Sequence, residues 1–485
     1  MLTKEQVRKI KWYRQSGAGI PFTIGIPFLA MIPFYEKTGF YFPNDLATFL
    51  KTDKGFTFYH YFDYYLTLEL TQKLFDLVSN DIKFFEDFKK DFYKAGPRSE
   101  EIGLKILEMP IKSTEFKKGY ESFVKESLRF WADSLYLDFF DPFENKVIAF
   151  IFGDKLPAKE QINILLSPDD LSNFQQEQIA LLEIYEKSSG RIDGRIKDSL
   201  KEHSRKYYWL KNDYEKIEYL DEKYYLKELE KFFNKPHLAL DIKRGLKRFQ
   251  KNQEAKKNLI IKSDLDKETI KRLNFFNWVT FYRDERKRFN QIGNYILIKV
   301  IEKIHQEMGI ELEALKYAMP DEVIQIIDSD KDALAELEKR KGEGVVVFAD
   351  KDKPIEVVSG KIAREYFVVE KTIQSPEIKG MTASAGKAIG MARIILSQAD
   401  FNKMRKGDVL VASNTRPEYV SIMKKAVAIV VDEGGITCHA AIVSRELGIP
   451  CITGTQIATR SLKDGDLIDV NANHGLIKII KKAEE

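Results

Sequence analysis

The sequence predicts a multidomain protein with a large, mainly α-helical N-terminal region and a smaller C-terminal domain of strands and helices. Three observations carry this prediction. The chain has 485 residues, which is too many for a single hydrophobic core. Apolar residues recur at three- and four-residue spacing through the first three quarters of the chain. Beyond that region, short β-type runs alternate with glycine turns and short helical patterns.

The composition is that of a folded chain without a marked charge bias. Aromatic residues make up 12% of the sequence, so large cores are possible and disorder is not expected. The formal net charge of +4 is small for this length and gives no argument for a nucleic-acid partner. Cys438 and Cys451 cannot form a disulfide framework for the whole chain, so a reducing cytoplasm is the simplest location.

An apolar stretch over residues 20–35 follows a basic start and superficially resembles a signal peptide. Three prolines interrupt it, and it lacks a clean small-residue cleavage site. It also falls short of the unbroken apolar length that a membrane helix needs. We therefore expect a buried, proline-punctuated loop here, and no membrane segment.

The helical region is expected to contain several amphipathic helices separated by charged or Gly/Pro breaks. Glycine and proline at 95–97, and the segment 290–293, predict breaks of this kind. A basic run over 243–262 has little aromatic interleaving, so a solvent-exposed helix face is expected there. The helical patterns cover residues 63–79, 82–93, 113–134, 171–188, 196–213, 225–233, 264–308 and 321–327.

Short β-type runs at 344–348 and 354–358 predict a hairpin that caps the helical part. The domain prediction therefore has four parts. They are a helical region of unknown type over 1–170, a second helical domain over 171–370 that ends in the hairpin, a linker over 371–379, and a C-terminal domain over 380–485.

The C-terminal domain reads as alternating strands and helices. Its helices are expected at 418–425 and 437–447. Its strands are expected at 388–396, 409–412, 426–431 and 450–453, with a closing hairpin over 465–480.

The most specific motif follows the predicted strand at 426–431. It is the run DEGGITCHAAIVSRELGIP at 432–450. This run places a glycine pair in a tight turn and His439 in the first turn of the next helix. Backbone N–H groups and the helix dipole favour a phosphate group at such a place. A neutral imidazole nitrogen is also a competent nucleophile for covalent catalysis.

This run resembles the phosphohistidine signature of the phosphoenolpyruvate-utilising enzymes, such as phosphoenolpyruvate synthase, pyruvate phosphate dikinase and rifampin phosphotransferase. The glycine pair, Thr-x-His, Ala-Ala, Arg-Glu, Gly-Ile-Pro and the later Gly454-Thr455 stand in the register of that family. The resemblance implies that the C-terminal domain is the compact, swivelling β/β/α domain and that His439 is transiently phosphorylated. More loosely, residues 273–327 are similar to the helical segment that precedes this domain in rifampin phosphotransferase.

Several residues near His439 are candidates for holding the phosphoryl group. Gly434 and Gly435 permit close backbone approach and positive φ. Thr437 is expected to hydrogen-bond the phosphoryl oxygens, or to cap the helix. Arg445 is expected to pair with a phosphate, or else with a neighbouring carboxylate.

Related proteins keep a Thr-x-Pro loop that faces the histidine, and Thr415-Arg416-Pro417 stands at that place. The resemblance suggests that Arg416 touches a phosphate, although a helix-start loop capped by Thr415 explains the same residues. Arg283 and Arg286 are candidates for an acceptor pocket, with an i,i+3 ion pair as the simpler alternative.

The remaining histidines and Cys438 suggest no second site. No pair of histidines has metal-ligand spacing, so no metal site is expected in this chain. His60 and His203 are expected to be structural or exposed, and His474 is expected at the surface in a hairpin turn. The thiol of Cys438 is expected to fill space, since the adjacent His439 already explains the motif.

We find neither a glycine-rich ATP-grasp loop nor the phosphoenolpyruvate-binding barrel of the synthases and dikinases. The resemblance therefore implies a phosphotransferase component of the pyruvate, water dikinase type. A separate ATP-grasp protein with ATP and Mg²⁺, or phosphoenolpyruvate, would load His439, and a small-molecule acceptor would discharge it. The alternative is a non-catalytic regulatory or binding module. The sequence names neither the acceptor nor the oligomeric state.

Overall fold

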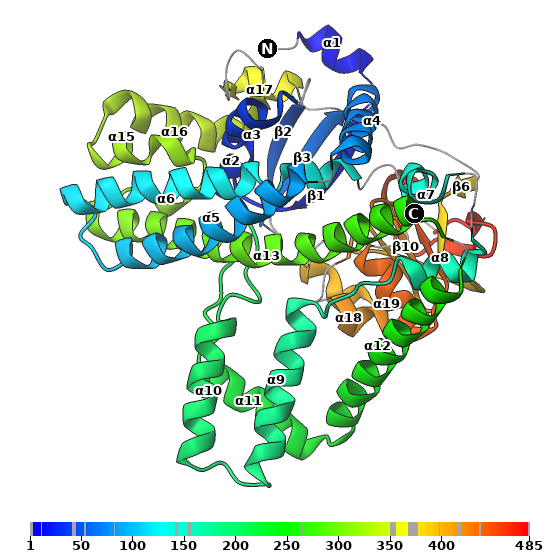
Figure 1. The fold of residues 1–485 in the computed structure, drawn as a ribbon. Coiled ribbons are helices and arrows are strands. Elements are labelled where there is room, and N and C mark those ends of the chain that lie inside the picture. Colours follow the sequence, from blue (N-terminus) through cyan, green and yellow to red (C-terminus); the bar gives the residue numbers. More distant parts are fainter. Residues whose placement is uncertain are drawn as a thin grey trace. The chain divides into compact units, whose positions relative to one another are not determined.

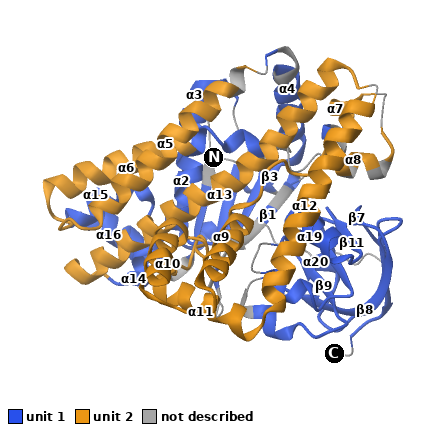
Figure 2. Cartoon of the chain, turned by 60° about the horizontal axis from the view of Figure 1, so that its bottom comes forward, with its two compact units in different colours: residues 1–81, 131–148, 311–485 blue, residues 82–130, 149–310 orange. Residues whose placement is uncertain are grey.

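The computed structural model describes residues 3–10, 12–40, 45–52, 55–81, 83–140, 144–153, 157–263, 265–349, 356–366, 377–396, 398–415, 419–435 and 438–483. Figure 2 shows the two compact units into which the chain divides. Unit 1 contains residues 1–81, 131–148 and 311–485, and unit 2 contains residues 82–130 and 149–310. The predicted borders at 170 and 370 do not separate these units, because unit 1 is assembled from three separate segments.

Unit 1 contains an antiparallel sheet of five strands in the order β1-β3-β2-β4-β5 (Figure 1). One face of this sheet packs Leu46, Tyr61 and Val346 into a buried cluster with Val7. The hairpin predicted over 344–358 supplies the last two strands of this sheet. The strands are β1 (Trp12–Ala18), β2 (Asp45–Thr52), β3 (Gly55–Asp63), β4 (Val345–Ala349) and β5 (Glu356–Ser359).

The prediction that residues 1–170 are helical is therefore wrong over the first three strands. The sequence of β3, GFTFYHYFD, is rich in aromatic residues that favour a pleated surface. Its aromatic side chains point to both faces, so it lacks the polar alternation of a half-exposed strand.

The expected loop over 20–35 is also wrong, because this segment forms α2 (Pro21–Leu29) and α3 (Met31–Thr38). Pro21 occupies the first position of α2, where a missing N–H costs nothing. Nearly every residue of α2 is buried, so packing outweighs the interior Pro27. A side chain at Gly25 would place its Cβ only 2.5 Å from Cδ of Pro320, so this helix needs glycine at its contact.

The other helical elements of unit 1 include α4, as predicted over 63–79, with Asp63 as its N-cap. Among the described residues, no helix is both long enough and apolar enough to cross a membrane. These elements are α1 (Lys4–Lys9), α4 (Tyr64–Asn80), η1 (Leu135–Phe140), α14 (Leu312–Leu315), η2 (Pro320–Glu322), α15 (Val323–Ile327), α16 (Lys331–Glu343) and α17 (Lys361–Tyr366).

The described part of unit 2 is helical. α9, α10 and α11 lie side by side (Figure 1) and share one buried apolar cluster. Helices α6 and α7 each cross a border between the two units. The helices are α5 (Phe84–Ile106), α6 (Thr114–Ala132), α7 (Glu144–Phe152), α8 (Lys159–Leu165), α9 (Asn173–Ser188), α10 (Gly194–Tyr207), α11 (Glu222–Asn234), α12 (His237–Lys262) and α13 (Lys267–Met308).

The helix breaks predicted at 95–97 and 290–293 are wrong. α5 runs through the glycine and proline at 95–97, and α13 is an unbroken helix of 42 residues. Gly96 is a packing position, because a Cβ there would lie 2.8 Å from the ring of Phe289 on α13. Tertiary packing of α5 against α13, with Phe92 and Tyr282 rings 4.2 Å apart, outweighs the local preference of glycine and proline.

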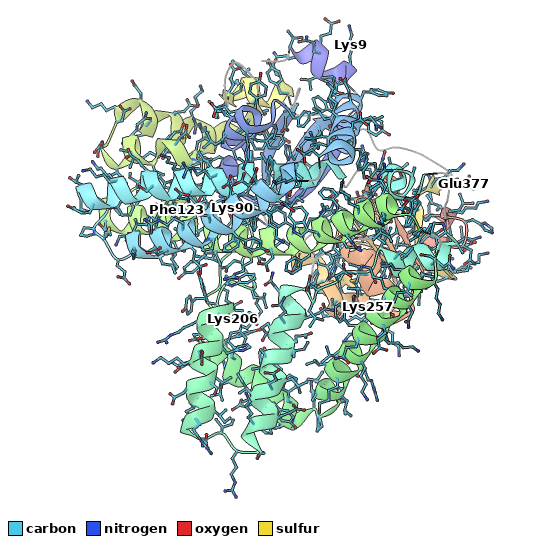
Figure 3. All side chains as sticks on the ribbon, viewed as in Figure 1. Lys9, Lys90, Phe123, Lys206, Lys257 and Glu377 are labelled. Atoms are coloured by element: carbon cyan, nitrogen blue, oxygen red, sulfur yellow. The ribbon has the colours of Figure 1, made fainter. Side chains whose placement is uncertain are left out.

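The basic run over 243–262 lies on α12, and most of its charged side chains are exposed, as expected. Figure 3 labels Lys257 on this helix and Lys206 on α10, both exposed lysines. Lys256 is the exception, since it is buried and its Nζ lies 2.7 Å from the carboxylate of Asp169.

The C-terminal part of unit 1 is an eight-stranded sheet in the order β6-β13-β12-β8-β9-β10-β11-β7. The four central strands, β8, β9, β10 and β11, pair with one another in parallel. All other pairs in this sheet, which are β6–β13, β13–β12, β12–β8 and β11–β7, are antiparallel. The strands are β6 (Glu377–Lys379), β7 (Met381–Ser384), β8 (Lys387–Ile394), β9 (Val409–Ala412), β10 (Ala428–Val431), β11 (Cys451–Thr453), β12 (Leu467–Asn471) and β13 (Leu476–Lys481).

Two apolar clusters cover this sheet. In the first cluster, Ile429 of β10 packs with Ala441 of α19 (His439–Leu447). In the second cluster, Val430 of β10 packs with Ala458 of α20 (Ala458–Ser461). The predicted linker over 371–379 is wrong for its last three residues, which form β6, and its earlier residues lie outside the described part of the chain. Helix α18 (Val420–Met423) lies within the predicted 418–425 segment, and η3 (Gln398–Lys403) was not predicted.

Candidate functional site

The site is built where two neighbouring parallel strands end. β9 and β10 pair in parallel, so the residues that follow them meet at the same edge of the sheet. The N–H of Glu433 donates to the carbonyl of Ser413 at 2.8 Å, which continues the pairing past the strand ends. In open α/β sheets, this carboxyl edge is where ligands bind.

The loop after β10 turns sharply at Gly434, whose φ is +81°. A Cβ at this position would lie 2.6 Å from Cβ of Cys438, so only glycine fits. The N–H of Cys438 donates to the carbonyl of Gly435 at 3.2 Å, which closes the loop. The chain therefore enters α19 immediately afterwards, and His439 is the first residue of that helix.

Thr415 holds the imidazole of His439 from the neighbouring strand end. Its hydroxyl Oγ1 lies 2.8 Å from Nδ1 of His439, and Thr415 is buried. Beside it, the side-chain amide of Asn414 donates to the carboxylate of Glu433 at 2.9 Å. Because Thr415 engages Nδ1, the other ring nitrogen, Nε2, is the candidate nucleophile.

Asp432, which follows β10, holds the chain that follows β11 at the same edge of the sheet. The sequence pattern did not predict this role. Its buried carboxylate accepts the hydroxyl of Thr455 at 2.7 Å and the N–H of Ala458 at 2.6 Å. It also accepts the N–H and the hydroxyl of Thr459. The carboxylate thus caps α20 and anchors the loop after β11. The sequence feature that could have predicted this role is the position of Asp432, an acidic residue directly after a continuously apolar strand.

Arg445 has a structural contact in addition to its predicted role. Its guanidinium donates to the carbonyl of Ala383 in β7 at 3.0 Å, which ties α19 to the edge strand. Phosphate binding by Arg445 stays a prediction. Thr437 and Arg416, two further predicted phosphate-binding residues, lie outside the described residues.

Arg283 and Arg286 lie on α13 in unit 2, whereas His439 lies in unit 1. Between them, Asp284 accepts the backbone N–H of Asn173 at 2.6 Å and its side-chain amide at 3.0 Å. This contact joins α13 to the start of α9. An acceptor pocket at the two arginines stays a prediction.

The two thiols of the C-terminal domain have different surroundings. Cys451 is fully buried, and burial raises the pKa of its thiol to about 12. Cys438 is half-buried at the N-cap of α19. In the part of the chain that the structure describes, no three His, Cys, Asp or Glu residues gather closely enough to hold a metal ion.

Comparison with known proteins agrees with this geometry. Residues 404–475 match the family model of the PEP-utilising enzyme mobile domain. A probable phosphoenolpyruvate synthase of Archaeoglobus fulgidus is 42% identical over 146 residues, which cover 29% of this chain and 19% of that protein. The phosphoenolpyruvate synthase of Pyrococcus furiosus is 46% identical over 114 residues, which cover 22% of this chain and 14% of that protein.

The uncharacterized phosphotransferase YvkC of Bacillus subtilis is 43% identical over 106 residues, which cover 22% of this chain and 13% of that protein. The chain thus spans less than a fifth of the length of these relatives. The matched residues include the strand ends, the glycine turn and His439. The C-terminal part of this chain, over residues 404–475, therefore belongs to the mobile-domain family of the PEP-utilising enzymes.

Proposed function

We propose that this protein is a phosphotransferase component that carries a phosphoryl group on Nε2 of His439. The observation that carries the proposal is the contact of 2.8 Å between Thr415 Oγ1 and His439 Nδ1. It fixes the ring at the start of α19, and it assigns the two ring nitrogens to different tasks. The family of the mobile domain supports the same chemistry.

In the loading step, the lone pair of Nε2 attacks the phosphorus of the donor. The N–P bond forms as the P–O bond to the donor breaks, and the electron pair leaves with the donor oxygen. The first N–H groups of α19 and the positive end of its dipole favour the anionic phosphoryl group beside His439. Gly434, Gly435, Thr437, Arg416 and Arg445 are the proposed supporting residues.

We assign the donor site to a separate ATP-grasp protein that binds ATP and Mg²⁺, with phosphoenolpyruvate as the other candidate donor. The names of the similar synthases support a reaction of the phosphoenolpyruvate synthase type. Phosphoryl transfer depends mainly on positioning and charge stabilisation, which suits a mobile carrier. The acceptor is a small molecule, with pyruvate, water or another hydroxyl compound as candidates, and we place the reaction in the cytoplasm.

The test is a phosphohistidine assay with the whole chain. The protein is incubated with labelled ATP plus a candidate ATP-grasp protein, and separately with labelled phosphoenolpyruvate. We expect base-stable, acid-labile label that is lost in His439→Ala. His474→Ala is the matched control, because His474 lies in the turn between β12 and β13 of the same domain.

Either outcome is informative about the function. A donor that labels the wild type and His474→Ala, but not His439→Ala, identifies both the carrier residue and the phosphoryl donor. Equal label in His439→Ala would contradict the proposal. Absence of label from every donor would instead favour the non-catalytic binding module.

A further inference from the structure

A pair of side chains joins the two loops that carry the contact between Thr415 and His439. The side-chain amide of Asn414 donates to a carboxylate oxygen of Glu433 at 2.9 Å. Asn414 stands directly before Thr415, and Glu433 stands directly before the glycine turn that leads to His439. The hydrogen bond is partly buried, so water competes with it less than on an open surface. We call Asn414 and Glu433 the strand-end clamp.

The strand-end clamp continues the backbone pairing of β9 with β10. Ala412 and Val431 are the last paired residues of the two strands. Past them, the N–H of Glu433 donates to the carbonyl of Ser413 at 2.8 Å. The side-chain hydrogen bond of the clamp lies one residue further along the chain that leaves β9. The two chains are therefore held together beyond the end of the sheet.

Two consecutive carboxylates tie the end of β10 to both neighbouring strand ends. Asp432 accepts the hydroxyl of Thr455, which follows β11, at 2.7 Å. Glu433 accepts the amide of Asn414, which follows β9. The turn at Gly434 therefore starts from a point that is fixed on both sides, and the helix that begins with His439 follows this turn.

The position of Thr415 decides which nitrogen of His439 a donor can reach. A neutral imidazole carries a proton on one nitrogen and presents a lone pair at the other. Oγ1 of Thr415 lies 2.8 Å from Nδ1, so a phosphoryl group cannot approach Nδ1 while this contact holds. Loss of the contact would open Nδ1 to the donor. Whatever holds Thr415 in place thus selects the reacting nitrogen.

We propose that Asn414 and Glu433 are positioning residues that direct the phosphoryl group to Nε2 of His439. The inference rests on the proposed function and deepens it, because it assigns the choice between the two ring nitrogens to the strand-end clamp. The clamp acts through Thr415 and does not touch the phosphoryl group. As the N–P bond forms at Nε2, the P–O bond to the donor breaks and its electron pair leaves on the donor oxygen. The proton on Nδ1 stays against Oγ1 of Thr415.

The test determines which ring nitrogen is phosphorylated. The whole chain is treated with phosphoramidate, which transfers its phosphoryl group to imidazoles and releases ammonia, so no donor protein is needed. The tryptic peptide over 426–445 contains His439 and no other histidine. It is isolated at alkaline pH, and phosphorus NMR separates Nδ1-phosphohistidine from Nε2-phosphohistidine by chemical shift.

The clamp is broken in Glu433→Ala and in Asn414→Leu. We expect the wild type to give the Nε2 isomer alone, and these variants to give about a tenth of the product or more as the Nδ1 isomer, because one hydrogen bond is lost. Asn473→Ala is the matched control. Oδ1 of Asn473 accepts the N–H of Gly386 at 2.9 Å in the same domain, so this variant also loses a side-chain hydrogen bond but should keep the wild-type product.

A swap of the two groups separates the hydrogen bond from the charge. Glu433→Gln keeps an acceptor oxygen for Asn414 and should give the wild-type product. Asn414→Asp sets two carboxylates against each other and should give the Nδ1 isomer. The double variant Asn414→Asp/Glu433→Gln reverses donor and acceptor, and should restore the Nε2 isomer. Failure of this rescue, with circular dichroism melting curves that show a folded protein, overturns the clamp.

A double-mutant cycle tests whether the clamp acts through Thr415. In the Thr415→Val background, Glu433→Ala should change the ratio of isomers no further. An unchanged ratio in both Glu433→Ala and Asn414→Leu also overturns the clamp. Failure of the wild type to load from ATP with an ATP-grasp protein, or from phosphoenolpyruvate, overturns the proposed function instead. The phosphoramidate reaction does not depend on either donor, so the two failures are distinguishable.

Discussion

His439 and His60 are held in the same way by different partners. One ring nitrogen of each histidine contacts an oxygen of another side chain. For His439 this is the neutral hydroxyl of Thr415, three residues after β9, and for His60 it is the carboxylate of Asp45 on β2. A hydroxyl can donate or accept, so it holds a neutral imidazole without drawing a proton onto it. A carboxylate stabilises the protonated ring. The hydroxyl partner thus suits His439 to attack phosphorus as a neutral imidazole, whereas the partner of His60 is a buried carboxylate.

The largest expected effect on the loading of His439 comes from replacing its hydroxyl partner, Thr415, with a carboxylate. Thr415→Asp would give His439 the partner of His60 and place a negative charge where the phosphoryl group must sit. Like-charge contact in a partly buried site costs several kcal/mol, so we expect loading of His439 to fall by about 10³-fold. The measurement is the initial rate of label incorporation from the effective donor.

Two milder variants at the same position calibrate that result. Thr415→Ser keeps the hydroxyl and should load at close to the wild-type rate. Thr415→Val removes one hydrogen bond worth about 1 kcal/mol, so loading should slow by roughly five- to tenfold. Equal rates for the valine and serine variants would show that the contact with Nδ1 does not orient the ring.

The reactivity of the two thiols reports how accessible the N-cap of α19 and strand β11 are. Burial raises the pKa of Cys451 to about 12, so little thiolate is available, whereas Cys438 is half-buried beside His439. We expect Cys438 to react with a thiol reagent at pH 8 on the order of 100-fold faster than Cys451. Cys438→Ala should abolish the fast phase. A fast phase that persists in this variant would mean that the buried thiol of Cys451 in β11 becomes accessible to the reagent readily.

The smallest predicted effect concerns the folding free energy that is lost by burying the carboxylate of Asp45. Its pKa is raised in the folded state, so the folded protein binds this proton more tightly than the unfolded chain. The resulting destabilisation is absent at low pH and grows as the pH rises through the folded-state pKa. Asp45→Asn should therefore gain stability relative to wild type between pH 4 and pH 7, by about 1 kcal/mol.

Thermal melting at the two pH values tests this expectation. A variant that loses stability relative to wild type as the pH rises would show that the ionised carboxylate of Asp45 stabilises the sheet.

The two sheets also differ in how far the sequence predicts them. In the C-terminal domain, continuous apolar strands bounded by glycine turns predicted the central strands and the start of α19, because local signals and tertiary packing agree there. The loop with Thr415 was expected to face the histidine, and the structure places it in contact. Asp432 was missed, because its partners follow a different strand.

The N-terminal sheet was missed for a physical reason. Its strand β2 is buried on both faces and pairs with β4, whose residues are remote in the sequence. In α2, burial outweighs the interior Pro27, which locally opposes a helix. The Asp45–His60 contact depends on the same pairing of β2 with β3, so the sequence alone offered two isolated residues.

The pairing of β2 with β4 has a consequence for biosynthesis. The first three strands emerge from the ribosome early, yet their partner β4 is made only after the whole of unit 2. At translation rates of roughly 5–20 residues per second, the edge of β2 waits for on the order of tens of seconds. During that time the unpaired edge of β2 is exposed to other nascent chains. Yield in the cell should therefore depend on chaperones that shield this edge, more than on the final stability of the fold.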